Sequence, residues 1–322
     1  NKFKFATVLS LIFSFLLFPF NAPSQVRPIY DNGAIGLGQM LKRLQTTASA
    51  MHTGAHPDDE DSNLIAYLAR GRAAYLSLNR GEGGQNVIGA ELFEPLGVIR
   101  TEELLQARRL DGGQQFFTSV MDYGFSKTRA EAARIWGEKE TLADMVRAIR
   151  IFRPLIVVSR FSGTPADGHG QHQLAGYLTP LAYKAAADPS QFPEQIAEGL
   201  LPWQAKKLYV GQGFAAAANG EPAGVSVNTG EYDPLIGRSY AEIAAEGRSQ
   251  HKSQEMGSTE RRGSQSSGER LLDSTVKTSG KENDVFDGID TSIKGIAKLT
   301  DNSENGLSGK LSDLQDTAEK AL

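Results

Sequence analysis

The segment AHPDDE at positions 55–60 joins one histidine to three consecutive acids. His56 and Asp59 are three residues apart across a turn that Pro57 fixes, and this spacing can bring an imidazole and a carboxylate to the same side, as a metal site requires. Asp58 lies between them and points elsewhere, which leaves it free to act as a base. Helix capping would explain one acid, but three acids repel one another unless a cation offsets their charge. The segment therefore predicts metal binding.

A second segment, DGHGQH at positions 167–172, places His169 and His172 three residues apart. The chain has only five histidines, and four of them, counting His52 and His56, lie in or beside these two segments. One HxxH pair is a weak signal, whereas two histidine-bearing turns in one chain are a stronger one. His52 belongs to the preceding strand, where we expect it to be packed or hydrogen-bonded.

Together, His56, Asp59 and His172 offer two nitrogens and one oxygen, and three protein ligands plus a water is the open arrangement of catalytic zinc. Zinc lowers the pKa of such a water to about 7, and Asp58 would then accept its proton. His169 would stabilise an oxyanion or protonate a leaving amine. The donor set also suits Mn, Fe or Co.

A glycine-rich stretch, NRGEGGQN at positions 79–86, lets the backbone approach a ligand closely. Arg80, Glu82, Gln85 and Asn86 have donors and acceptors suited to sugar hydroxyls, although a flexible polar turn has the same composition. Arg100 opens a later helix, where a cation is disfavoured, so we expect it to reach a ligand or to pair with an acid near the metal. The spacing of a phosphate-binding loop is absent.

The elements around these segments alternate between strand and helix. The apolar runs predict strands at 48–55, 73–78, 115–121, 154–159 and 207–210 and helices at 59–70, 97–110, 138–152 and 171–187. This alternation is typical of an α/β, Rossmann-like open sheet that is mostly parallel and flanked by helices. Ligands of such sheets bind beyond the carboxyl ends of the strands, where both histidine segments fall.

Composition narrows the class of protein further. The formal net charge is −4, without a basic cluster, so we expect no nucleic-acid partner. The chain has no cysteine, which excludes disulfides, thiolate metal sites and cysteine nucleophiles. Neither a GxSxG nor an HExxH segment is present.

Three zones follow one another along the chain. Residues 1–25 combine a basic start with an apolar run too short to span a bilayer and a small-residue cleavage point, which predicts a signal peptide and an exported, periplasmic or extracellular protein with no stable membrane span. Residues 26–256 form the expected catalytic domain. Residues 257–322 read as a polar linker and helical extension, with apolar periodicity at Leu311, Leu314 and Ala318, and we expect the natural protein to continue beyond them.

AHPDDE, RGEGG, the RxxE that begins at Arg100 and the late HxxH together resemble the LmbE-like, or PIG-L, deacetylases, over roughly residues 48–257. The resemblance implies a Rossmann-like fold with zinc at the strand ends, held by His56, Asp59 and His172. It also implies Asp58 as the base and His169 as an electrostatic catalyst. Many members have an aspartate between the late histidines where this chain has Gln171, and some have a tyrosine where it has Asp167.

The leading hypothesis is a zinc-dependent deacetylase that acts on an N-acetyl amino sugar or a similar small-molecule or glycan substrate. An amidase on a thiol or other small conjugate keeps the metal and changes the substrate. A non-catalytic carbohydrate-binding module on the same fold is the third reading, and the base Asp58 argues against it. The sequence does not specify the acyl group or the oligomeric state.

Overall fold

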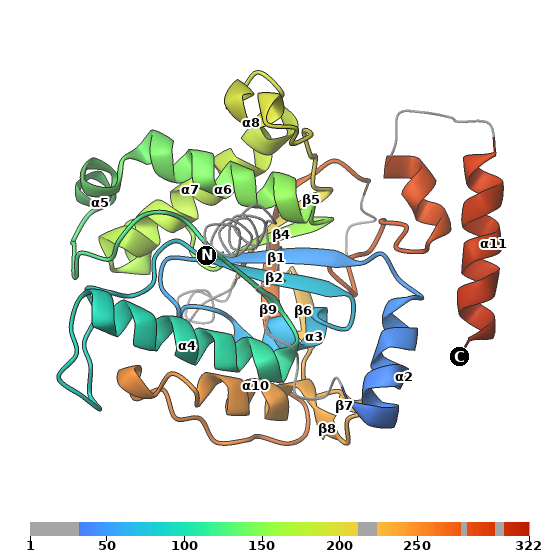
Figure 1. The fold of residues 1–322 in the computed structure, drawn as a ribbon, viewed down its shortest axis with the longest axis horizontal. Helices are drawn as coiled ribbons and strands as arrows, with labels where there is room; N and C mark the ends of the chain where they lie inside the picture. Colours follow the sequence, from blue (N-terminus) through green and yellow to red (C-terminus); the bar gives the residue numbers. More distant parts are fainter. Residues whose placement is uncertain (1–31, 212–223, 278–281, 300–305, 322) are drawn as a thin grey trace, which may run out of the picture.

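The computed structural model describes residues 32–211, 224–277, 282–299 and 306–321. A seven-stranded sheet in the order β3-β2-β1-β4-β5-β9-β6 runs through the molecule (Figure 1). The strands from β3 to β5 are parallel, while β9 is antiparallel to both β5 and β6. The strands are β1 (Ser49–Gly54), β2 (Arg72–Ser77), β3 (Gln114–Phe117), β4 (Ile156–Ser159), β5 (Lys207–Gly211), β6 (Val225–Asn228) and β9 (Ser266–Ser274). This architecture confirms the predicted mostly parallel α/β fold.

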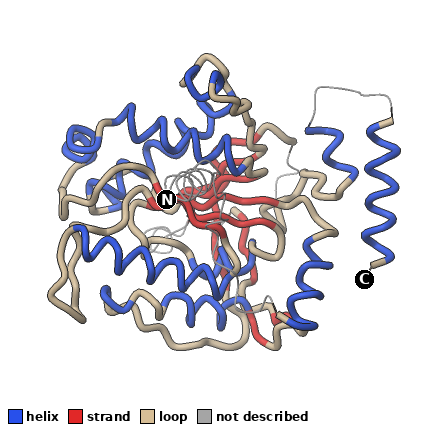
Figure 2. Tube along the Cα trace, viewed as in Figure 1, coloured by secondary structure: helices blue, strands red, loops and turns tan. Residues whose placement is uncertain are grey.

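Helices cover both faces of the sheet, so that the strands form a middle layer (Figure 2). One face is covered by α5 (Arg129–Trp136), α6 (Glu138–Phe152) and α7 (Gly170–Ala187), and the other by α3 (Ser62–Leu68), α4 (Glu94–Asp111) and α10 (Tyr240–Arg248). The remaining elements are peripheral or short: α2 (Gly33–Arg43), α8 (Pro193–Ala197), α11 (Leu307–Lys320), the 3-10 turns Pro165–Asp167, Lys252–Gln254 and Lys294–Leu299, and a two-stranded ribbon of β7 (Tyr232–Asp233) and β8 (Arg238–Ser239).

The core has two halves because successive side chains of a strand point to opposite faces. Met51 and Val157 pack with the helices α5 to α7, whereas Ala50 and Val158 pack with α3. All residues of β1 and β4 are buried, and for β4 the continuous apolar run predicts a strand covered on both sides. Since these strands are fixed along their whole length, the turns that follow them are held in place.

The C-terminal part of the chain completes the sheet, which corrects the predicted boundary at residue 257. Within the stretch read as a polar linker, Ser266–Ser274 forms β9 and lies between β5 and β6. Ser267 and Glu269 of this strand are buried despite their polarity. Strand pairing uses backbone groups, which every residue but proline supplies, and so a polar stretch can fill this position.

The residues after β9 are also attached to the domain. Lys207 on β5 forms a buried ion pair with Glu282, and the Gln45 side chain donates a hydrogen bond of 2.6 Å to the carbonyl of Ala318 in α11. The periodicity at Leu311, Leu314 and Ala318 falls within α11, which confirms the predicted helix. Within residues 257–322, strand β9 of the main sheet therefore comes first, and the helical extension follows it.

The predicted signal peptide at residues 1–25 lies outside the described residues and stays a prediction. Among the helices that the structure describes, none combines the length and the apolar character that crossing a bilayer demands.

Candidate metal centre and catalytic cleft

Both histidine segments lie at the carboxyl ends of neighbouring parallel strands. The first turn follows β1, and the second segment follows β4 and leads into α7. The N-cap of α3 is Asp61, whose Oδ1 accepts a hydrogen bond of 3.0 Å from the Leu64 amide. Because Asp61 caps this helix, Asp58 and Asp59 are not needed for capping and are available to the site.

Three side chains converge as the sequence predicts. His56 Nδ1 lies 3.2 Å from Asp59 Oδ2 and 3.1 Å from His172 Nε2, and His172 Nε2 lies 3.4 Å from Asp59 Oδ1. These are the donor atoms expected of a metal site, and all of them fall within 4.8 Å of one another. Asp59 is itself held in place, since its Oδ2 accepts hydrogen bonds from the amides of Ala55 (2.9 Å) and His56 (2.6 Å).

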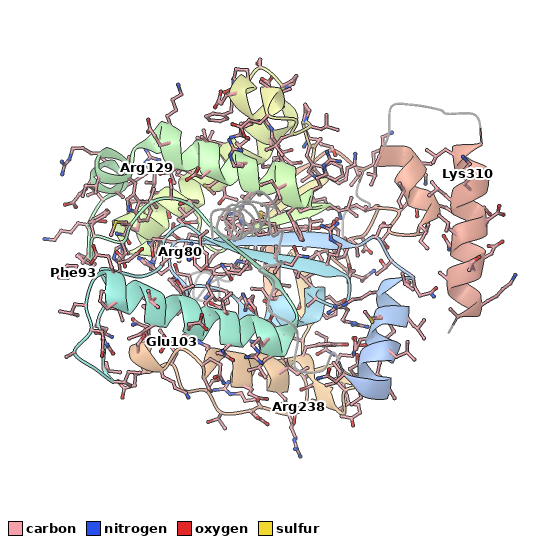
Figure 3. The ribbon with its side chains drawn as sticks, in the orientation of Figure 1. Arg80, Phe93, Glu103, Arg129, Arg238 and Lys310 are labelled. Atoms are coloured by element: carbon pink, nitrogen blue, oxygen red, sulfur yellow. The ribbon has the colours of Figure 1, made fainter. Side chains whose placement is uncertain are left out.

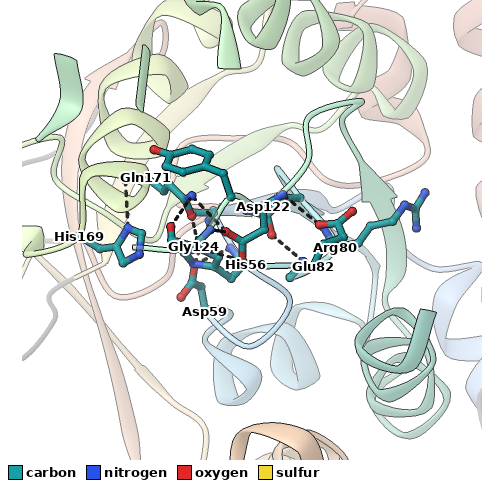
Figure 4. A network of polar contacts seen from close by, with 12 residues as sticks. His56, Asp59, Arg80, Glu82, Asp122, Gly124, His169 and Gln171 are labelled. Atoms are coloured by element: carbon teal, nitrogen blue, oxygen red, sulfur yellow. Dashed lines mark hydrogen bonds and ion pairs between the residues drawn. The ribbon is translucent and has the colours of Figure 1, made fainter. Parts of the chain in front are cut away.

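The tautomer of His56 follows from its neighbours (Figure 4). The Gln171 amide nitrogen donates to Asp122 Oδ1 at 3.1 Å and to the Gly124 carbonyl at 3.0 Å, so Gln171 Oε1 must face His56. Oε1 is an acceptor only, and therefore His56 Nε2 carries the hydrogen and donates it to Gln171. The lone pair of His56 Nδ1 is left to face Asp59 and His172.

His172 is oriented in the same way. Its Nδ1 lies 3.2 Å from the Asp167 carbonyl, which can only accept, so Nδ1 carries the hydrogen and Nε2 presents its lone pair. The ring stacks on Phe161 at 4.1 Å between centroids, with an interplanar angle of 9°. Two lone pairs and a carboxylate thus face one another, an arrangement that only a cation or a proton between them stabilises.

The pKa values of His56 and Asp59 indicate the same requirement for positive charge. Burial opposes protonation of His56, but the Asp59 carboxylate, with a contribution from Asp122, raises its pKa to about 9. Burial likewise opposes ionisation of Asp59, yet the charges and hydrogen bonds of His172 and His56 bring its pKa well below the ordinary value. The chemistry of the donor set therefore fits a divalent metal.

Asp58 lines the same cleft as the triad and pairs with Arg100. The Arg100 guanidinium donates to Asp58 Oδ1 and, at 3.1 Å, to the Gly81 carbonyl. Arg100 is buried, and its atoms would collide with a Cβ at Gly81 or Gly84. Gly81 and Gly84 of the RGEGG stretch thus make room for this arginine. Of the two alternatives for Arg100, the structure shows the pairing with an acid beside the candidate metal site.

His169 is the N-cap of α7. Its Nδ1 accepts a hydrogen bond of 3.2 Å from the Gln171 amide, so in the neutral ring Nε2 carries the hydrogen. The ring lies edge-on to His56 at 5.1 Å and to Phe125 at 4.9 Å. Burial and the neighbouring His56 and His172 lower the pKa of His169 to about 4. His169 is therefore a neutral hydrogen-bond donor at physiological pH.

A cleft of about 590 Å³ opens over these groups. Its walls combine several predicted site residues with side chains from the segments that follow β3 and β4 and from the end of α10 and the segment after it. The side chains that line it are His56, Asp58, Asp59, Gln85, Arg100, Asp122, Phe125, Arg160, Phe161, His169, His172, Arg248, Gln254 and Met256.

Arg80, Glu82 and Asn86 do not line this cleft, although they were predicted to bind substrate. Arg80, labelled in Figure 3, is exposed and stacks on the Phe117 ring at 4.0 Å. Glu82 is buried and accepts hydrogen bonds from the amides of Arg80 and Asp122. Asn86 folds its own loop by accepting from the amides of Ile88 and Gly89. Their places in the structure give all three a structural role.

Several cleft residues were not among the predicted site residues. Asp122 follows β3 by five positions, and Arg160 is the residue after β4, so both fall at strand ends. A search of strand ends for polar side chains would have found them. Arg248 and Met256 come from the end of α10 and the turn that follows, far along the chain, and only the fold brings them to the cleft.

Comparisons with known proteins agree with this geometry. Residues 51–183 match the family described as PIG-L: GlcNAc-PI de-N-acetylase. A mycothiol S-conjugate amidase of Streptomyces coelicolor is 27% identical over 186 residues, which cover 53% of this chain and 62% of that protein. A 1D-myo-inositol 2-acetamido-2-deoxy-alpha-D-glucopyranoside deacetylase 2 of Frankia casuarinae is 30% identical over 184 residues, covering 51% and 57%. The chain thus spans about three fifths of the length of these two curated relatives.

Among solved structures, an N,N'-diacetylchitobiose deacetylase from Pyrococcus horikoshii superimposes with a TM-score of 0.51. It is 15% identical in sequence, and the match covers 70% of this chain and 83% of that one. At this identity the likeness shows a shared fold.

Proposed function

Residues 51–183 form a PIG-L family domain, and from this premise we propose that the chain is a metal-dependent hydrolase that removes an N-acetyl or other N-acyl group from an amino sugar or a glycoconjugate. The observation that supports it most is the convergence of His56, Asp59 and His172 beside Asp58 and His169 in one cleft. A binding module would need neither a carboxylate beside the metal ligands nor a neutral histidine facing them.

His56, Asp59 and His172 would hold the metal, and zinc suits two imidazoles and one carboxylate, as do Mn, Fe and Co. When bound, such a metal acts as a Lewis acid towards a carbonyl oxygen and lowers the pKa of water. Gln171 and the Asp167 carbonyl keep the ring nitrogens of His56 and His172 in the tautomers that this site needs.

Asp58 is the proposed base. Arg100 holds Asp58 Oδ1, so the carboxylate is oriented within the cleft and ready to take the proton of the attacking water. The water oxygen then bonds to the amide carbon. As the C–N bond breaks, the proton passes from Asp58 to the departing nitrogen, which leaves as an amine while the acyl group leaves as a carboxylic acid.

His169 is the proposed oxyanion donor. Its Nε2–H is free of the N-cap bond that Nδ1 makes, and the ring lines the cleft. The low pKa of this histidine favours a hydrogen bond from the neutral ring over transfer of a proton. This distinction assigns delivery of the proton to Asp58 rather than to His169.

An amidase on a small conjugate is the second candidate, because one of the two relatives carries that name while the other is named a deacetylase. Both reactions break an amide bond, and the residues above serve either of them equally. The substrate panel therefore decides between the two.

The test is acetate release from N-acetylated sugars, glycan fragments and thiol conjugates by the zinc-loaded protein. Asp58→Ala should keep its metal and lose turnover, while His172→Ala should lose the metal, as measured in each variant by elemental analysis. Release of amine from the thiol conjugates alone would favour the amidase. If the three proteins hold equal metal and none turns over any compound, the hydrolase proposal is wrong and a binding role replaces it.

A further inference from the structure

Three arginines line the cleft, and they differ in their partners. Arg100 is paired with Asp58. Arg160, at the end of β4, makes no ion pair with any residue of the described ranges. Arg248, at the end of α10, donates to the carbonyl of Asp58 at 3.1 Å and to the sulfur of Met256 at 3.4 Å, neither of which carries a charge. Two guanidinium groups in the cleft therefore form no ion pair with the described residues.

One carboxyl group that could neutralise Arg160 is that of Glu269 on β9, whose pKa responds to the arginine charge. Glu269 is buried, and its Oε2 has no hydrogen-bond partner. Burial and the charge of Asp61 raise the pKa of Glu269 well above its ordinary value, which favours the neutral acid. This carboxyl group does not offset the arginine.

Arg160 and Arg248 approach the cleft from one side of the sheet. Ile156 and Val158 of β4 point towards the α3 side, so Arg160 continues the same alternation, and its charge is felt by His52 on that side. Arg248 ends α10, which covers that face. His169, Phe125 and Phe161 belong to segments that join the opposite layer.

The net charge of the cleft with a metal bound also favours an anionic ligand. Its three arginines face three aspartates, Asp58, Asp59 and Asp122, and a divalent metal would add two positive charges. An excess of positive charge within a partly enclosed cleft attracts an anion more strongly than a charge in open solvent does. Guanidinium groups are the side chains best suited to bind carboxylate or phosphate oxygens with two hydrogen bonds.

We propose that Arg160 and Arg248 form an oxyanion subsite, and that the substrate is an N-acylated amino sugar that carries a carboxylate or a phosphate. This inference rests on the proposed function for the amide chemistry, while the subsite itself is a binding property. The rings of Phe125 and Phe161 on the other wall offer flat apolar surfaces against which a sugar ring packs.

Binding is measured first, by calorimetry on metal-loaded Asp58→Ala protein, so that no probe is consumed. The probes share one sugar and differ in charge: N-acetylglucosamine is neutral, N-acetylglucosamine 6-phosphate carries a phosphate and N-acetylmuramic acid carries a carboxylate. At least one anionic probe should bind about tenfold or more tightly than the neutral one, as hydrogen bonds between charged groups predict. The tighter of the two anions identifies the group that the subsite accepts.

Arg160→Gln and Arg248→Gln, each added to Asp58→Ala, should bring the ratio of anionic to neutral affinity towards one. Arg109→Gln is the matched control, since Arg109 is exposed on α4 and bonds only Gln106 among the described residues. Equal affinity for all three probes overturns the inference. So does a preference that survives both substitutions, because the metal, or Arg100 without its partner Asp58, would then bind the anion.

Hydrolysis of the probes is measured separately from their binding. Acetate release by the wild-type protein is followed with the same three probes. If no probe is hydrolysed but the anionic preference depends on the arginines, the proposed function fails and the subsite stands. If the neutral and anionic probes are hydrolysed with equal kcat/KM, the proposed function stands and the subsite is wrong.

Discussion

Gln171 accepts a hydrogen bond from His56 Nε2 and thereby turns His56 Nδ1 towards Asp59 and His172. The same glutamine donates to Asp122, whose Oδ2 lies 4.0 Å from His56 Nε2. An acid at position 171 would contact the histidine directly. Here the neutral side-chain amide of Gln171 makes that contact, and the negative charge belongs to Asp122, which Gln171 holds by a hydrogen bond. The geometry of the candidate metal site thus depends on a side chain that is not one of its expected ligands.

Gln171→Leu should weaken metal binding by about tenfold to a hundredfold, because His56 loses the acceptor that fixes its tautomer. The affinity is measured by competition with a chelator. Gln173→Leu is the control, since Gln173 is buried on the same helix but bonds the carbonyls of Lys127 and Gly168. Equal affinity in the two variants would show that Gln171 does not orient the ligand.

Metal binding should strengthen with rising pH. In the metal-free protein the pKa of His56 is about 9, whereas the pKa of Asp59 lies well below its ordinary value, so below about pH 9 the metal must displace one proton from His56. The apparent affinity should therefore rise about tenfold per pH unit, or about a hundredfold between about pH 6 and about pH 8. Titrations in two buffers of different ionisation enthalpy would count the released proton. An affinity that does not change over this range contradicts the pKa of about 9.

Arg100→Gln should lower kcat by about tenfold to a hundredfold, since a charged hydrogen bond that orients the base Asp58 is lost. Bound metal should be unchanged, because Arg100 contacts none of the three ligands. Arg80→Gln gives the contrast: Arg80 stacks on Phe117 outside the cleft, and its loss should change kcat by no more than about twofold. Acetate release under saturating substrate measures both. A larger effect at Arg80 would restore the substrate-binding role that its sequence context suggested.

The sequence predicts the strand β4 from its continuous apolar run, and it predicts the metal ligands because histidines and acids lie close together in two short segments. β9 escaped prediction because Ser266–Ser274 pairs through its backbone, and its buried Ser267 and Glu269 have the composition of a linker. Asp122, Arg160 and Arg248 escaped for a different reason. Each is a single polar residue, and only the strand order β3-β2-β1-β4 and the path of α10 bring them to one cleft.

Glu242 should make the free energy of unfolding depend on pH under acidic conditions. It forms a capping box with Ser239 at the start of α10, and the Ser239 amide, with Arg262, lowers the pKa of Glu242 from 4.5 to about 2. A folded-state pKa below the unfolded value means stabilisation that is present above about pH 4.5 and is lost as the pH falls towards 2. Glu242→Gln should therefore cost about 1 kcal/mol at pH 7 and progressively less at about pH 3, in urea unfolding followed at both pH values. A cost that does not fall with pH would argue against the ionised cap.

Substituting one member of the Lys207–Glu282 ion pair should lower the free energy of unfolding more than substituting both. Both side chains are buried, Lys207 Nζ also lies 3.3 Å from the Val285 carbonyl, and Tyr209 donates to Glu282 Oε2 at 3.0 Å. Glu282→Leu leaves a buried ammonium without its carboxylate and should lower the free energy of unfolding by about 3–5 kcal/mol. Lys207→Met combined with Glu282→Leu removes both charges and should recover most of that loss, because paired burial of charge contributes little net stability. Urea unfolding of the two variants and of Lys207→Met alone measures the coupling. If Glu282→Leu is as stable as the parent, the segment after β9 is not packed against β5. If the two substitutions are coupled as expected, Glu282 is part of the domain core.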